Sequence, residues 1–189
     1  MKKISILHVL VSFLLTAVAA VLLLIPEPGG TYVRLFGLEL LPVVLCGTLC
    51  GDFFGLLSGL VVPSASLLLL PETVFMPDTF GQMILLAASG FFAGWVFRKL
   101  RYSIPAAMIG ILAGRIAYGL FMLLFCFFSG TVYTSEAFLS EAVIEVWPGL
   151  LVCLSVTPIL MRLLHMLGLT TLLGNEPAGK EKEIVHRVS

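Results

Sequence analysis

The chain alternates long apolar stretches with short polar breaks, and the lengths of the apolar stretches predict membrane-spanning helices. The first stretch, Ile4 to Ile25, contains 22 residues, close to the roughly 20 that cross a bilayer. The apolar region of a signal peptide is only about 7–15 residues long. We therefore expect a retained first helix.

The second apolar stretch is too long for one helix. A straight helix from Leu40 to Leu70 would measure about 46 Å, whereas the hydrocarbon core is about 30 Å thick. The sequence CGDFFG, Cys50 to Gly55, supplies the break, and Asp52 is expected to be the N-cap of the next helix. Six helices are predicted in all, near 4–25, 33–50, 53–70, 80–98, 104–128 and 137–165.

The distribution of basic residues orients these helices. With six spans and both termini on one side, that side receives nine of the 11 Lys and Arg residues. The other side receives Arg34 alone, and Arg115 lies within a span. Such a bias marks the cytoplasmic side. We therefore expect both termini in the cytoplasm and the loops at 26–33, 71–79 and 129–136 outside.

Composition agrees with this picture. Hydrophobic residues make up 59% of the chain and charged residues 12%, and the mean hydropathy is +1.10. Soluble domains carry about 25% charged residues, so we expect an all-α integral membrane protein. We expect residues 1–168 to form its six-helix transmembrane domain, and 169–189 to form a polar cytoplasmic tail that is disordered. The net charge of zero and the apolar bulk argue against a nucleic-acid partner.

Motifs for catalysis, metals or nucleotides are weak. Cys46 and Cys50 are one helical turn apart, but no His or carboxylate lies at ligand spacing beside them, so we interpret them as small packing residues. The sequence GNEPAGKE, Gly174 to Glu181, matches a P-loop except that Glu181 replaces the Ser or Thr that holds magnesium. We expect no metal, no cofactor and no ATP binding by this chain, and a membrane enzyme is not favoured.

Small residues recur at every fourth position in several predicted helices. Such spacing lets helix backbones approach closely in lipid. Each stripe serves either packing within the bundle or contact with a partner. The stripes are Ser12, Thr16 and Ala20; Gly47, Gly51, Gly55 and Gly59; Gly90 and Gly94; and Ala106, Gly110 and Gly114.

Arg115 is the most informative residue, because it lies within an otherwise uncharged stretch from 102 to 135. A charge at the centre of a bilayer costs about 2.5–3.5 kcal/mol on insertion scales. Tyr118 shares its helix face, and Glu145 in the last helix is its expected partner. The pair either marks a ligand cavity or forms a purely structural clasp.

Further polar and aromatic residues gather in the outer half of the predicted bundle. Glu141 shares a helix face with Glu145. It either belongs to the site or simply lies near the lipid headgroups. Glu39 lies in the second predicted helix. Tyr118 and Trp147 offer flat surfaces to a ring. The candidate substrate-binding residues are Arg115, Glu145, Glu141, Tyr118, Gln82 and Trp147.

Three segments in order resemble one family. LELLPVVLCGTLCGDFFGLLSGLVVP, AGRIAYGL and EVWPGLLVCLSVTPILMRLL resemble the substrate-binding S components of energy-coupling factor (ECF) vitamin transporters. The resemblance implies a six-helix subunit in a bacterial plasma membrane that captures a vitamin-like or nucleobase-like molecule from outside. It also implies a transmembrane coupling subunit and two cytoplasmic ATPases as partners, with Ser12, Thr16 and Ala20 contacting the coupling subunit.

The chain departs from this family in two places. Similar members often carry His before the proline of the second helix, where this chain has Leu41. They also carry Glu in the fourth helix, where this chain has no acid around Met83 to Leu86. The ligand therefore differs or the pocket is more apolar. The alternative interpretation is a membrane scaffold of MreD-like size and topology, which needs no ligand.

Overall fold

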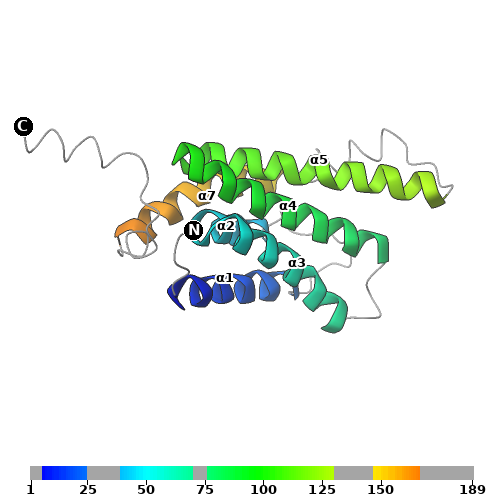
Figure 1. Ribbon diagram of the computed structural model, residues 1–189, viewed down its shortest axis with the longest axis horizontal. Helices are drawn as coiled ribbons and strands as arrows, with labels where there is room; N and C mark the ends of the chain where they lie inside the picture. Colours follow the sequence, from blue (N-terminus) through cyan, green and yellow to red (C-terminus); the bar gives the residue numbers. More distant parts are fainter. Residues whose placement is uncertain (1–5, 25–38, 70–75, 130–146, 167–189) are drawn as a thin grey trace, which may run out of the picture.

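The computed structural model describes residues 6–24, 39–69, 76–129 and 147–166. These residues form helices and no strand, which confirms the predicted all-α class (Figure 1). The segments Thr79–Leu100 and Ser103–Phe128 are long and apolar enough to cross a membrane. The helices are α1 (Ile6–Leu24), α2 (Leu40–Cys50), α3 (Asp52–Leu69), α4 (Met76–Leu100), α5 (Ser103–Ser129) and α7 (Trp147–Met166).

The break between α2 and α3 occurs where the sequence predicts it. Gly51 alone separates the two helices and adopts a φ of +112°, a conformation that favours glycine. Its N–H donates to the carbonyl of Gly47 at 3.0 Å, and the N–H of Gly55 donates to the carbonyl of Gly51 at 3.0 Å. The expectation that Asp52 caps α3 is wrong by one residue, because Asp52 is already helical.

The other described boundaries differ little from the predicted ones, except at the starts of α2 and α4. Helix α2 begins at Leu40 rather than near residue 33, so Glu39 precedes the helix instead of lying within it. Helix α4 also departs from its predicted start. This helix begins at Met76, within the segment expected to be an outer loop. Pro77 does not prevent this, because proline is tolerated in the first turn of a helix, where its missing N–H would have no partner. The expected loops at 26–33 and 129–136, the tail at 169–189 and the first part of the helix expected at 137–165 lie outside the described residues.

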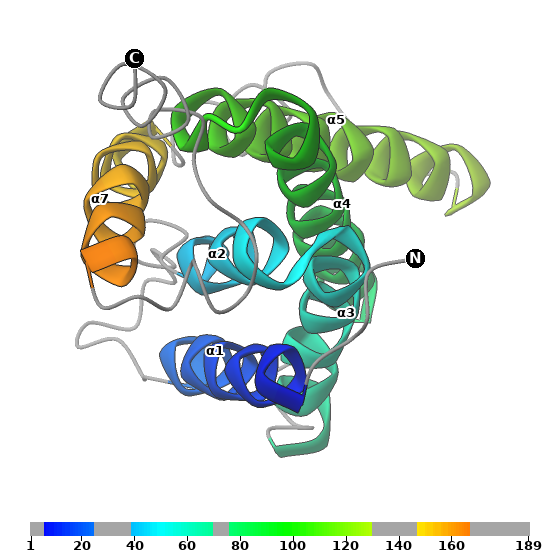
Figure 2. The same ribbon diagram turned by 60° about the vertical axis from the view of Figure 1, so that its left-hand side comes forward.

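Helix α2 occupies the centre of the bundle and contacts all the other described helices (Figure 2). Ten of its 11 residues are buried, Leu41 being the exception. This position explains why α2 is apolar on every side rather than amphipathic. The start of α2 is thereby placed beside both α5 and α7.

Four glycines bring the backbones of α2, α3 and α4 together: Gly47, Gly55, Gly90 and Gly94. A Cβ atom at Gly55 would lie 2.7 Å from the Cα of Gly47, and one at Gly90 would lie 2.7 Å from the carbonyl carbon of Gly55. A Cβ at Gly94 would lie 2.6 Å from the carbonyl oxygen of Gly47. Glycine spacing therefore serves packing within the bundle here, and Gly47 and Gly55 contribute from opposite sides of the break.

Helices α4 and α5 pack antiparallel through small residues. A Cβ at Gly110 would lie 2.7 Å from the Cβ of Ala93, and one at Gly114 would lie 2.6 Å from the carbonyl oxygen of Leu85. Such close approach allows van der Waals contact along most of both helices. It also fixes the side of α5 that faces α4, and Gly110 and Gly114 lie on this side.

Many large apolar side chains are exposed on this protein, and several small polar side chains are buried. Phe13 on α1 is 77% exposed and Phe128 on α5 is 83% exposed, whereas Ser89 and Thr157 are fully buried. The exposed apolar surface extends over both helices, and the end of α5 projects beyond α1, α2 and α7 (Figure 1). A surface of this kind suits apolar surroundings.

Candidate functional site

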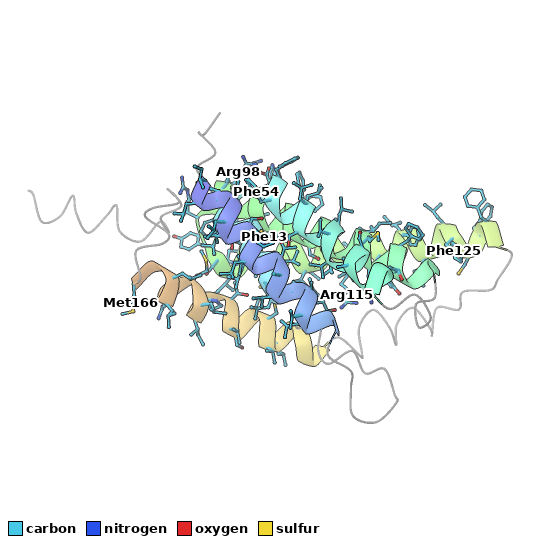
Figure 3. The ribbon with its side chains drawn as sticks, turned by 90° about the horizontal axis from the view of Figure 1, so that it is seen from below. Phe13, Phe54, Arg98, Arg115, Phe125 and Met166 are labelled. Carbon is cyan, nitrogen blue, oxygen red and sulfur yellow. The ribbon has the colours of Figure 1, made fainter. Side chains whose placement is uncertain are left out.

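Arg115 lies midway along α5, remote from the charged end of the bundle marked by Arg98 (Figure 3). Gly114 contacts α4, and the next residue, Arg115, is half-buried. Its Nε atom is buried and has no hydrogen-bond partner within the described ranges. The guanidinium remains charged in a protein, so an unpaired buried N–H is an unusual feature that calls for a partner.

Glu39 is the carboxylate that the structure brings to Arg115. It lies at the N-cap position of α2, but its side chain makes no cap hydrogen bond. The carboxylate instead acts electrostatically on Arg115 of α5 and on Cys153 of α7. Helix α2, which follows Glu39, contacts both of these helices.

The electrostatic influence of Glu39 on Arg115 is absent from the sequence-based expectations. The sequence marks Glu39 as an isolated acid at the start of an apolar run, but nothing in its spacing relates it to a residue of α5. Glu145, the expected partner, and Glu141 lie outside the described residues. Their placement beside Arg115 stays a prediction.

Tyr118 is placed by a glycine on the neighbouring helix. The Tyr118 side chain is 8% exposed, and a Cβ at Gly81 of α4 would lie 2.6 Å from its Cε2 atom. The ring therefore fills the space that the missing side chain leaves. Tyr118 also interacts electrostatically with Arg115, one turn earlier on α5. The prediction that the two residues share a face is confirmed.

Gln82 and Trp147 are the remaining candidates on the described helices, and α7 also carries two buried residues joined by a hydrogen bond. Gln82 follows Gly81 on α4, is half-buried and has an interaction partner. On α7, the Thr157 hydroxyl donates to the carbonyl of Cys153 at 2.6 Å, and both residues are buried. Trp147 is the first residue of α7, and its side chain is outside the described part.

The predicted partner-contact residues of α1 face inward. Ser12 is 9% exposed and its Oγ lies 3.3 Å from the Sγ of Cys46 on α2. The Thr16 hydroxyl donates to the Ser12 carbonyl at 2.8 Å and lies 2.9 Å from the Ser58 hydroxyl of α3, with which it shares a second hydrogen bond. Ala20 is half-buried. In this structure the stripe packs α1 onto the bundle, and its contact with a coupling subunit stays a prediction.

The opposite end of the bundle carries charges of a different kind. Asp52, at the start of α3, forms an ion pair with Arg98 near the end of α4, and the Arg98 side chain is 55% exposed. The Nζ of Lys99 lies 3.9 Å from the centre of the Trp95 ring, a cation–π contact. These exposed pairs differ from Arg115, whose charge is placed among helices.

The chemistry that the described site offers is binding. Arg115 supplies N–H donors, Glu39 supplies acceptors and the opposite charge, and Tyr118 supplies a fixed aromatic ring. No group of three or more His, Cys, Asp and Glu residues that could hold a metal ion occurs in the part of the chain that was described. Cys46 and Cys50 are buried free thiols in the core.

Comparison with protein-family models, with curated proteins and with solved structures finds no match to this chain. The assignment of a function therefore depends on the site and on the sequence pattern.

Proposed function

We propose that this protein is the substrate-specific subunit of an ECF-type importer. In this proposal six helices cross a bacterial plasma membrane, and both termini are cytoplasmic. The subunit captures a small vitamin-like or nucleobase-like molecule from outside. A coupling subunit and two ATPases then drive its uptake.

The single observation that carries this proposal is the unpaired, buried Nε of Arg115. A buried donor without a partner costs about 1–3 kcal/mol, and polar groups among transmembrane helices are by default functional. A molecule that enters from the outer side and accepts this hydrogen bond recovers that cost. A scaffold without a ligand has no use for such a donor.

The proposed site lies among α4, α5 and α7. Arg115 contacts the cargo, Tyr118 and Trp147 pack against it, and Gln82, Glu141 and Glu145 donate or accept hydrogen bonds. Glu39 joins this set from the structure, because it interacts with Arg115. The outer segments at 26–33 and 71–79 cover the site.

In the proposed complex, α1 contacts the coupling subunit. Because the hydroxyls of Ser12 and Thr16 are both hydrogen-bonded inside the bundle, this contact would use the part of the stripe that stays accessible at Thr16 and Ala20, both half-buried. The exposed apolar side chains on the other side of α1, such as Phe13, would then face lipid.

Native mass spectrometry of the detergent-purified protein tests the proposal. The parent protein is expected to retain one small molecule, and Arg115→Ala to bind it about 10- to 150-fold more weakly, the range for a lost charged hydrogen bond. Arg98→Ala is the matched control, because it removes an exposed arginine at the other end of the bundle.

Two results would overturn the proposal. One is an Arg115→Ala variant with unchanged affinity and unchanged thermal stability. The other is co-purification with cell-wall synthesis proteins instead of a coupling subunit and two ATPases, which would support the MreD-like scaffold.

A further inference from the structure

Helix α4 ends in a cluster of basic and aromatic side chains that we name the α4 corner. The cluster covers the last turns of α4 and the two residues that join this helix to α5. Most of its side chains are exposed, and it lies at the end of the bundle marked by Arg98, remote from Arg115 (Figure 3). The α4 corner consists of Trp95, Arg98, Lys99, Arg101 and Tyr102.

Positive charge is in excess at the α4 corner. Arg98, Lys99 and Arg101 contribute three positive charges, and the exposed ion pair of Arg98 brings the one negative charge of Asp52 to them. Two further acidic residues occur in the described ranges, and both lie at the opposite end of α2 or α4: Glu39 and Asp78. Three positive charges against one negative charge leave an excess of two.

A row of aromatic rings leads along α4 to these charges. The rings of Phe92 and Trp95 meet edge to face, with 6.4 Å between their centroids. The Nζ of Lys99 lies 3.9 Å from the centre of the Trp95 ring. All three side chains are exposed. One face of α4 therefore changes from apolar rings to a cation over about 10 Å, as a phospholipid changes from acyl chain to headgroup.

Arg101 adopts a backbone conformation that is unfavourable for an arginine. Its φ is +60°, and its N–H donates to the carbonyl of Phe97 at 2.9 Å, which ends α4. Glycine is the usual residue at such a helix end, because a side chain is disfavoured in the left-handed region. An arginine at this turn therefore lowers local stability, and its charge offers a reason for its presence.

From these observations we infer that the α4 corner binds the headgroup of an anionic phospholipid, with an acyl chain lying along Phe92 and Trp95. Basic residues at the end of a membrane helix attract anionic headgroups, and their N–H groups form charge-assisted hydrogen bonds with phosphate oxygens. Tryptophan and tyrosine favour the same depth in a bilayer. The inference rests on the membrane location in the proposed function, but not on the cargo or on transport.

Native mass spectrometry of the detergent-purified protein tests the inference. The protein is mixed with equal amounts of phosphatidylglycerol, which is anionic, and phosphatidylcholine with the same acyl chains, which is zwitterionic. Retention of phosphatidylglycerol is expected to be about 30-fold higher, or about fivefold for each of the two excess charges. The preference should shrink as the salt concentration rises, because salt screens exposed charges. Equal retention of the two lipids overturns the inference.

Substitutions locate the preference on the protein. Lys99→Gln and Arg101→Gly are each expected to lower the preference for phosphatidylglycerol about fivefold. Arg162→Gln is the matched control, because it removes an exposed arginine on α7, outside the α4 corner. The control should keep the preference of the parent. An equal loss in the control overturns the inference, because the preference would then follow the total charge of the protein.

Arg101→Gly also separates lipid binding from the structure of the turn. Glycine adopts a φ of +60° without strain, so this variant should unfold at the same temperature as the parent or a higher one while it retains less phosphatidylglycerol. A lower unfolding temperature with unchanged lipid retention overturns the inference. None of these substitutions touches the site around Arg115, so retention of cargo by the parent protein decides the importer function separately.

Discussion

Substituting Gly94 by alanine tests the close arrangement of α2, α3 and α4. An added Cβ would lie 2.6 Å from the carbonyl oxygen of Gly47 and 2.6 Å from the backbone nitrogen of Asp52. Ordinary van der Waals contact begins at 3.4 Å, so the helices must separate by about 0.8 Å. Neither neighbour can rotate away, because both atoms belong to backbones.

The expected cost follows from this overlap. Inserting a methyl group into a well-packed core costs about 1–3 kcal/mol. A value of about 2 kcal/mol lowers the ratio of folded to unfolded protein about 30-fold. The separation also moves α4 away from Asp52, so Gly94→Ala is expected to weaken the ion pair between Asp52 and Arg98.

The assay is unfolding of the purified protein in mixed detergent micelles, followed by tryptophan fluorescence. Val61→Ile is the matched control, because it also adds one methyl group, but on a residue that is 52% exposed. The control should unfold like the parent. A Gly94→Ala variant within about 0.5 kcal/mol of the parent, the range of ordinary surface substitutions, would show that the three backbones do not approach as described.

Two further substitutions test contacts between helices. Asp52→Asn removes the ion pair with Arg98 and should cost less than about 1 kcal/mol, because exposed pairs contribute little; thermal unfolding should show that the loss shrinks at high salt, and a loss independent of salt would contradict it. Thr16→Val leaves the Ser58 hydroxyl without its partner and should destabilise the protein by about 0.6 kcal/mol, the average for hydrogen bonds between membrane helices. Thr16→Ser keeps the bond and should match the parent, whereas equal losses in both variants would show that the methyl group of Thr16 matters instead.

The helices themselves were predictable because their causes are local. Apolar stretches of sufficient length predict α1, α3 and α5 within a few residues of their observed bounds, and the break at Gly51 follows from chain length and glycine content. The start of α4 was missed, because Pro77 is compatible both with a loop and with the first turn of a helix.

The candidate site was predicted only in part. The sequence identifies Arg115 as a charge that needs a partner, and helical periodicity places Tyr118 on its face. It does not identify Glu39, because that carboxylate reaches Arg115 through the packing of α2 against α5. The inward orientation of Ser12 and Thr16 likewise depends on which side of α1 meets α2 and α3.

The sequence alone determined the helical class, the approximate bounds of α1, α3 and α5, and the presence of a costly charge within an apolar stretch. These properties depend on hydrophobicity and spacing along one segment. The tertiary structure decided which residues meet: Asp52 with Arg98, Ser12 with Cys46, and Gly47 with Gly90 and Gly94. The physical reason is that partner choice depends on the rotation and register of one helix against another, which close glycine contacts determine and which no single helix encodes.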